Sequence, residues 1–254
     1  MNNLVLLKKE MRENRWKFLI GLAIFLVSNI TLPFLYDTIE KIINRNAMTP
    51  GMERFLGSLN TFDAYIWSQW AKTMNQYGAI LAIVLGMGAV SPEVSSRTIE
   101  FLLTKPVRRS QVFAKKYLAG WIILALVVIF STLAIYPAAT FAGHDYTSVK
   151  LLLCMVPALS ALSIIYGIAV FASVCFDSSL KAGGAAGVVA LLLAIPSLVE
   201  YWVEGTKVLS IYYHMGGEPI FQGEPFPWLP LGIMIAAAVG IYFAGRQLFL
   251  KRDF

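Results

Sequence analysis

The residue types that carry enzyme chemistry are few in this chain and lie far apart. The 254 residues include two histidines, His144 and His214, and two cysteines, Cys154 and Cys175. Each histidine falls in a separate loop without neighbouring ligands at metal-site spacing, so we interpret both as surface residues. The cysteines lie 21 residues apart in one expected helix, which separates them by about 31 Å along its axis. A disulfide joins Cα atoms about 6 Å apart, so we interpret the cysteines as packing residues.

Sequence motifs for catalysis are also absent. The chain contains no GxxxxGK[ST] phosphate loop, no HExxH metal motif and no GxSxG nucleophile elbow. We therefore expect no enzyme activity, no cofactor and no metal site in this chain. The apolar segments described below contain no Asp, Glu, Lys, Arg or His, whereas ion-driven carriers usually place such residues inside the membrane. If the protein moves a substrate, we expect the energy to come from outside the membrane.

Composition and hydropathy predict the elements that position these residues. Apolar residues make up 57% of the chain and charged residues 14%, and the mean hydropathy is +0.66. A soluble domain is roughly 45–50% apolar and about 25% charged. A helix needs about 20 residues to cross the hydrocarbon. Six stretches have this length and define an all-α polytopic membrane protein with six transmembrane helices: residues 18–36, 73–91, 118–141, 151–176, 182–199 and 228–245.

The distribution of basic residues predicts the orientation. Six spans place both termini on one side, and that side carries 15 of the 21 Lys and Arg residues. The positive-inside rule therefore predicts a multi-pass protein of the cell membrane with both termini in the cytoplasm. Residues 1–17 are typical of an interfacial amphipathic helix, or of a basic segment that only anchors the first span by its charge. Residues 200–227 form an expected external loop. The net charge of +6 comes from the excess of basic residues on this side, so we expect membrane lipid and no nucleic acid as a partner.

The most informative segment is the cytoplasmic loop between the second and third spans, residues 92–110. Read as a short helix, it places Glu93, Arg97 and Glu100 on one face. Its apolar stripe consists of Ile99, Leu102 and Leu103. A partner that pressed on this charged, amphipathic bar would move both attached spans. An interfacial helix without a partner is the alternative.

The order of residues in this loop resembles the conserved region of ABC-2 type transporter permeases. The loop contains Glu93, then Arg97-Thr-Ile-Glu100, then Pro106-Val-Arg-Arg-Ser110, and lysines follow. Family members commonly carry Glu, then Gly-Thr-(Leu/Ile)-Glu, then Pro-(Val/Ile)-Ser-Arg and a lysine. This chain departs from the pattern at Arg97, where Gly is common, and at Arg108, where Ser is common.

The resemblance implies the membrane subunit of a bacterial ABC exporter. Two such permease chains, identical or different, would work with two copies of a separate ATPase that binds ATP and Mg²⁺. The loop would be the coupling helix that docks on the ATPase, through Glu93, Arg97, Thr98, Ile99, Glu100, Leu102 and Pro106. The short loop after the fourth span, with Asp177 and Lys181, would make a second, smaller contact.

The start of the fifth span carries a small-residue face. Gly183 and Gly187 lie four residues apart, a spacing that lets two membrane helices approach closely. The pattern allows packing within the chain or between subunits, and both interpretations stay open.

Two other functions compete with transport. One is a non-transporting ABC permease homologue in a sensing or maturation complex. The other is an intramembrane enzyme, which would need a pair of polar catalytic residues at depth, and the sequence offers no such pair. The aromatic and apolar interior favours a hydrophobic or amphipathic substrate.

Overall fold

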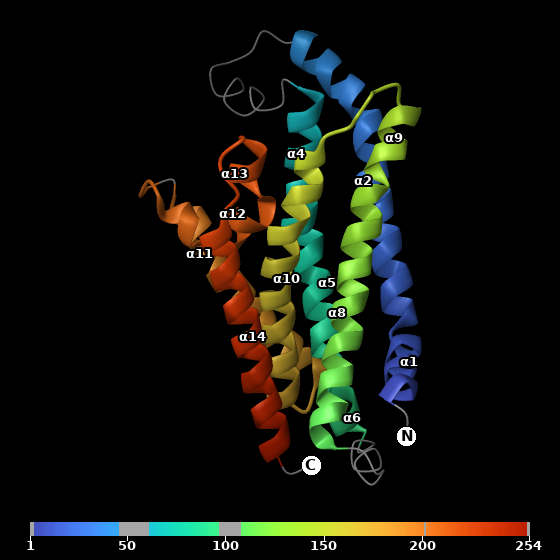
Figure 1. Ribbon diagram of the computed structural model, residues 1–254, viewed down its shortest axis with the longest axis vertical. Coiled ribbons are helices and arrows are strands. Elements are labelled where there is room, and N and C mark those ends of the chain that lie inside the picture. Colours follow the sequence, from blue (N-terminus) through green and yellow to red (C-terminus); the bar gives the residue numbers. More distant parts are fainter. Residues whose placement is uncertain (1–2, 46–60, 97–107, 201, 253–254) are drawn as a thin grey trace.

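The computed structural model describes residues 3–45, 61–96, 108–200 and 202–252. Within these ranges every regular element is a helix, so the expected all-α fold is confirmed. Figure 1 shows the long helices side by side, with both termini at one end of the bundle. We call this end the termini end and the opposite one the distal end.

Six helical segments are long and apolar enough to cross a membrane, as the sequence predicted. They are Arg15–Lys41, Phe62–Ser95, Arg109–Phe141, Val149–Cys175, Ser179–Val199 and Trp228–Lys251. The chain is therefore a multi-pass membrane protein.

These six segments contain most of the labelled helices. The labelled helices are α1 (Asn3–Glu13), α2 (Arg15–Arg45), α4 (Phe62–Thr73), the π-helix η2 (Met74–Gly78), α5 (Ala79–Met87), α6 (Ser91–Ser95), α8 (Arg109–Leu133), α9 (Ile135–Phe141), α10 (Val149–Cys175), α11 (Ser179–Val199), the 3-10 helix η3 (Thr206–Leu209), α12 (Ile211–Gly216), α13 (Glu218–Phe221) and α14 (Trp228–Lys251). The second membrane segment joins α4, η2, α5 and α6, and the third joins α8 and α9.

The second membrane segment begins at Phe62, whereas the apolar run predicts a start of the second span at residue 73. Thr61 precedes the helix in an extended conformation, and its hydroxyl accepts a hydrogen bond of 3.2 Å from the N–H of Ala64. This is an N-cap, which satisfies one of the free donors of the first turn. The polar side chains of Asp63 and Lys72 are exposed, so hydropathy alone does not identify this part of the helix.

Helix α10 forms the centre of the bundle and packs against α5, α8, α11 and α14. Its contact with α5 is close because Gly86 has no side chain. A Cβ added to Gly86 would lie 2.5 Å from the Cβ of Ala169 and 2.8 Å from the carbonyl oxygen of Tyr166. Small residues at such crossings let helices approach backbone to backbone in a membrane.

Polar groups in the interior form hydrogen bonds between helices. The indole N–H of Trp70 on α4 donates to the hydroxyl of Thr132 on α8 at 2.8 Å. The hydroxyl of Tyr166 on α10 donates to the carbonyl oxygen of Tyr117 on α8 at 2.8 Å. Both aromatic side chains are fully buried. Such pairing is favourable because an unpaired polar group is costly inside the hydrocarbon.

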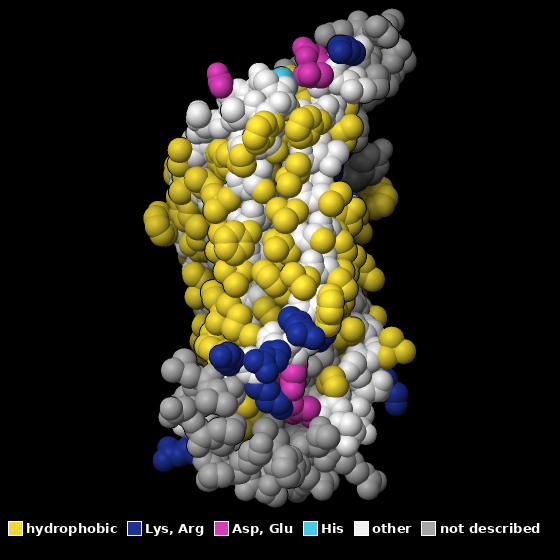
Figure 2. Space-filling model, turned by 90° about the vertical axis from the view of Figure 1, so that its right-hand side faces the viewer, with side chains coloured by type: hydrophobic (Ala, Val, Ile, Leu, Met, Phe, Trp, Pro, Cys, Tyr) yellow, Lys and Arg dark blue, Asp and Glu magenta, His cyan; other side chains and the backbone are white. Residues whose placement is uncertain are grey.

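The outer surface is apolar between two polar ends. Figure 2 shows hydrophobic side chains over the middle of one face, with basic and acidic side chains at its ends. Helices α11 and α14 expose many large apolar side chains, among them Leu191, Leu198, Leu229 and Ile233. Such a belt is the surface expected of a protein that lies in a bilayer.

Candidate functional site

The termini end of the bundle brings together the N-terminal segment and the ends of the two loops for which the sequence predicts contacts with a partner. Helix α1, the short helix α6 and the first turns of α8 meet there, and the turn between α10 and α11 lies at the same end. Helix α1 packs along α8. These elements position a set of charged side chains at the base of the predicted coupling loop.

A buried ion cluster joins three of these elements. The ammonium Nζ of Lys116 on α8 lies 3.0 Å from Oε1 of Glu10 on α1 and 2.7 Å from Oε1 of Glu93 on α6. Lys116 and Glu10 are only 5% and 4% exposed. Because the lysine donor and the glutamate acceptors are all charged, these hydrogen bonds are stronger than hydrogen bonds between neutral groups. The cluster thus ties α1, α6 and α8 together through one ammonium group.

The electrostatics of this cluster depend on the lysine. Without the ammonium, two carboxylates would face each other in a buried place, which is strongly unfavourable. Burial raises the pKa of Glu10 above its ordinary value of 4.5, although the charge of Lys116 acts against this rise. Glu10, Glu13 and Glu93 also place one carboxylate oxygen each within 4.8 Å of one another. Because Lys116 bridges two of them, we interpret the group as an ion cluster rather than a metal site.

Glu93 is the one residue of the predicted coupling set that the structure describes. Its side chain points into the bundle towards Lys116 and is 17% exposed. The other residues of that set lie outside the described residues: Arg97, Thr98, Ile99, Glu100, Leu102 and Pro106. Glu93 therefore connects the base of the loop to α8.

Sequence reasoning did not identify Glu10 as a partner of Lys116. A signal for it exists in the sequence. Glu10 follows Leu6 by four residues, so the two side chains share one face of α1. Both are buried. An acidic residue on the apolar face of a basic amphipathic helix is a candidate for a buried ion pair.

The turn between α5 and α6 is fixed to α10 by a serine. The hydroxyl oxygen of Ser173 accepts hydrogen bonds from the backbone N–H groups of Val90 at 2.8 Å and Ser91 at 2.9 Å. The hydroxyl of Ser91 donates to the carbonyl oxygen of Met87 at 2.7 Å. Since these groups are buried, the bonds satisfy donors that would otherwise be unpaired. The start of the predicted coupling loop is therefore held on two sides, by Ser173 and by Lys116.

The predicted second contact also lies at the termini end. Asp177 forms an ion pair with Arg252, which follows α14, and the same guanidinium donates to the carbonyl oxygen of Val174. The side chain of Asp177 is 74% exposed, and Lys181 is exposed as well. The turn after α10 is thereby attached to the end of α14.

The two glycines of the small-residue face have different surroundings. A Cβ added to Gly183 would lie 2.5 Å from the sulfur of Met87 on α5, so this glycine permits close packing inside the chain. A Cβ on Gly187 would meet no atom of the described part of the chain within 4 Å. Gly183 thus packs inwards, and Gly187 lies on an uncovered face of α11.

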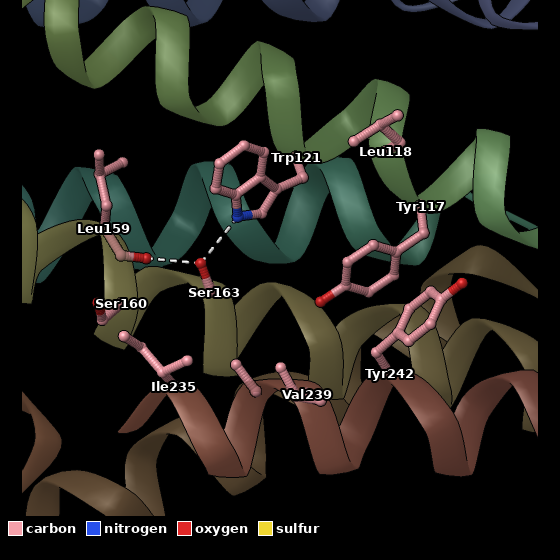
Figure 3. A pocket seen from close by; sticks show the side chains of 10 residues that line it. Tyr117, Leu118, Trp121, Leu159, Ser160, Ser163, Ile235, Val239 and Tyr242 are labelled. Carbon is pink, nitrogen blue, oxygen red and sulfur yellow. Dashed lines mark hydrogen bonds between the residues drawn. The ribbon is translucent and has the colours of Figure 1, made fainter. Parts of the chain in front are cut away.

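A cavity of about 370 Å³ opens between α8, α10 and α14 in the middle of the bundle. Figure 3 shows the ring of Trp121 beside it, with its N–H donating to the hydroxyl of Ser163 at 2.8 Å. That hydroxyl donates in turn to the carbonyl oxygen of Leu159 at 2.6 Å. The remaining walls are mostly aromatic and aliphatic, including Tyr117 and Ile235. The cavity fits an apolar group.

The histidines and cysteines have ordinary environments. His144 lies 3.1 Å from Asp37 and stacks on the ring of Phe62. His214 contacts the carbonyl oxygen of Val208 at 2.8 Å. Cys154 is buried and Cys175 is exposed, and both thiols are free.

Comparison with known protein families gives a match over most of the chain. The sequence model of a family described as "ABC-2 family transporter protein" matches residues 4–208. The matched range runs from α1 to η3 and includes the ion cluster and the predicted coupling loop. No curated protein matches the chain.

Proposed function

Because the chain belongs to the ABC-2 transporter family, we propose that it is the permease subunit of an ATP-driven exporter. In this proposal, a separately encoded ATPase binds ATP and Mg²⁺, and this chain has no catalytic activity of its own. The family match over most of the chain carries the assignment as a permease.

The ion cluster supports a coupling role for the loop between α6 and α8. A push on this loop would act on α6 and on the first turn of α8, which are continuous with two membrane segments. Lys116 and Glu93 connect these two ends directly, and Glu10 adds the interfacial helix α1. Buried, close-packed contacts transmit small displacements because they cannot deform gradually. We assign the loop as the docking element for the ATPase and the turn with Asp177 and Lys181 as a second contact.

Charge supports a cytoplasmic location for the termini end. Exposed basic side chains at this end include those of Lys8, Lys9, Arg12, Arg108 and Lys251. The positive-inside rule places such an end in the cytoplasm. The proposed arrangement is a cell-membrane protein whose termini and coupling loop face the ATPase.

The sparse packing of α11 supports an assembly of two permease chains with two ATPase copies. Few residues of α11 are buried within the chain, and Gly187 lies on its open side. A second permease, identical or different, would cover part of this surface, and a substrate path would run between the two. The apolar interior supports a hydrophobic or amphipathic substrate.

Copurification with the ATPase tests the proposed function. The double variant Ile99→Ala/Glu100→Lys changes an apolar and a charged residue of the docking loop, outside all expected spans. Such changes cost a few kcal/mol at an interface, which is about 10- to 100-fold in affinity. We expect the variant to insert normally, to lose the ATPase on purification and to fail to stimulate ATP hydrolysis in proteoliposomes.

The matched control is Thr147→Ala/Ser148→Ala at the distal end. This variant should retain the ATPase and its stimulation. If the docking variant retains both as well, the loop does not couple the two subunits, and if wild-type chain binds no ATPase, the proposal is wrong.

A further inference from the structure

The distal end of the bundle contains a second cavity, whose lining includes charged side chains. Helices α12 and α13 fold back there beside α4, η2 and α11. Together these elements line a half-open cavity of about 330 Å³. Its chemically distinctive lining residues are Trp67, Asn75, Glu200, Lys207, Tyr213 and Glu218. Three charged groups and three aromatic rings, those of Trp67, Tyr212 and Tyr213, line this cavity, whereas the walls of the cavity in Figure 3 carry no charged group.

The charges of this cavity sum to a negative value. Glu200 accepts hydrogen bonds from the backbone N–H groups of Lys207 at 2.8 Å and Gly205 at 3.2 Å, and from the hydroxyl of Thr206 at 3.2 Å. These donors, the N–H of Lys207 first, hold the pKa of Glu200 below its ordinary value of 4.5. Glu218 adds a second carboxylate, and Lys207 is the one basic residue among the lining residues. The cavity thus favours a cation.

Lys207 shows how a cation is held there. Its ammonium lies 3.5 Å from Oε1 of Glu218 and 5.0 Å from the centre of the Tyr213 ring. A carboxylate on one side and an aromatic face on the other is the usual environment of a bound organic cation. The Lys207 side chain is 39% exposed, so another cation can replace its ammonium without loss of a buried pair.

The ring of Trp67 and the side chain of Asn75 belong to the lining of the same cavity. The ring of Trp67 stacks on Phe221 at 4.6 Å, and its N–H donates to the carbonyl oxygen of Gly216 at 2.8 Å. Asn75 lies in the π-helix η2, and its side-chain oxygen is buried without a hydrogen-bond partner in the described part of the chain. Single π-helical turns within membrane helices are frequent at functional sites. Trp67 therefore offers an aromatic surface for the apolar part of a ligand.

We propose that this cavity binds an organic cation that joins an ammonium, amidinium or guanidinium group to an apolar body. The cationic group takes the place of the Lys207 ammonium between Glu218 and Tyr213. The apolar body lies against Trp67. Taken as the substrate site of the exporter, which rests on the proposed function, the cavity assigns organic cations as the substrate class.

Equilibrium dialysis of the purified full chain in nanodiscs with radiolabelled benzamidine tests this site. Benzamidine is cationic at neutral pH, carries N–H donors and has an aromatic body, and benzamide is its neutral counterpart. We expect benzamidine to bind and benzamide not to compete. Glu218→Gln should weaken binding by roughly tenfold or more, because a charged hydrogen bond is lost. Glu224→Gln, an exposed glutamate outside the lining, should bind as the wild type does.

Lys207→Met separates a binding site from a merely structural role. Removal of the competing ammonium should strengthen benzamidine binding several-fold, whereas loss of a structural ion pair would weaken it. Equal binding of benzamide, or weaker binding by Lys207→Met, would overturn the proposal. The assay contains no ATPase, so a failure here leaves the coupling proposal untouched, and a failure of ATPase copurification leaves this cavity assignment untouched.

Discussion

Lys116 and Glu93 lie 23 residues apart in the chain, yet their side chains meet at 2.7 Å inside the termini end of the bundle. The contact closes the base of the loop between α6 and α8. Glu10 extends it to α1 at 3.0 Å. One ammonium group therefore holds three segments that a docking partner would displace together.

Replacement of Lys116 tests this connection. Lys116→Met leaves two buried carboxylates without their cation, and loss of one partner of a buried ion pair costs about 3–5 kcal/mol. We expect a clear drop in the melting temperature of the purified chain. We also expect reduced stimulation of the ATPase, with hydrolysis by the isolated ATPase unchanged. Fluorescence-detected thermal unfolding and ATPase assays measure the two effects.

The control for Lys116→Met is the neighbouring Lys115→Met, which should change stability by less than about 0.5 kcal/mol. Lys116→Arg keeps the charge and should recover most of the stimulation. Equal effects of the Lys115 and Lys116 variants would contradict the role of the ion cluster.

The pH dependence of stability tests the state of Glu10. Its pKa in the folded chain is raised above 4.5, mainly by burial. Between 4.5 and the folded pKa, the folded state therefore binds more protons than the unfolded state, and stability falls as pH rises. Above the folded pKa the contribution is constant. Melting temperatures of wild type and Glu10→Gln, measured as a series across this window, should differ by an amount that changes with pH. A difference in melting temperature that does not change with pH would contradict a raised pKa of Glu10.

The membrane segments could be predicted from the sequence because their signal is local. Apolar runs as long as the hydrocarbon is thick identify all six. The start of the second segment could not be located in this way, because α4 carries Asp63 and Lys72 on its exposed side and follows an N-cap at Thr61. Asn75 and Gln76 interrupt the apolar run further along.

The ion cluster could be predicted only in part. The motif drew attention to Glu93 and to the lysines before the third span, but Glu10 and Lys116 are 106 residues apart. Their meeting depends on how α1 packs along α8, and no local pattern contains that information. The cavity with Lys207 and Glu218 likewise forms from residues of α4, η2 and the segment after α11.

Accessibility of introduced cysteines tests the orientation. Ser95 at the termini end is exposed, and Leu209 at the distal end is 79% exposed. In a background with Cys154→Ala and Cys175→Ser, we expect Leu209→Cys to react with a membrane-impermeant maleimide in intact cells. Ser95→Cys should react only after permeabilisation. Reaction of both in intact cells would exclude an arrangement with the termini end in the cytoplasm.

Leucine substitutions at Gly183 and Gly187 distinguish packing within the chain from packing between chains. At Gly183 the new side chain would collide with Met87, whose sulfur lies 2.5 Å from the position of a Cβ. Overpacking of this kind typically costs about 1–3 kcal/mol, so Gly183→Leu should lower the melting temperature of the chain. At Gly187 no described neighbour lies within 4 Å of the position of a Cβ, and Gly187→Leu should leave the melting temperature unchanged.

The same variant tests the interface between subunits. If a second permease packs against this face, Gly187→Leu should shift the purified complex towards single permease chains, as measured by light scattering on a size-exclusion column. An unchanged complex with Gly187→Leu would place the subunit interface elsewhere on the bundle.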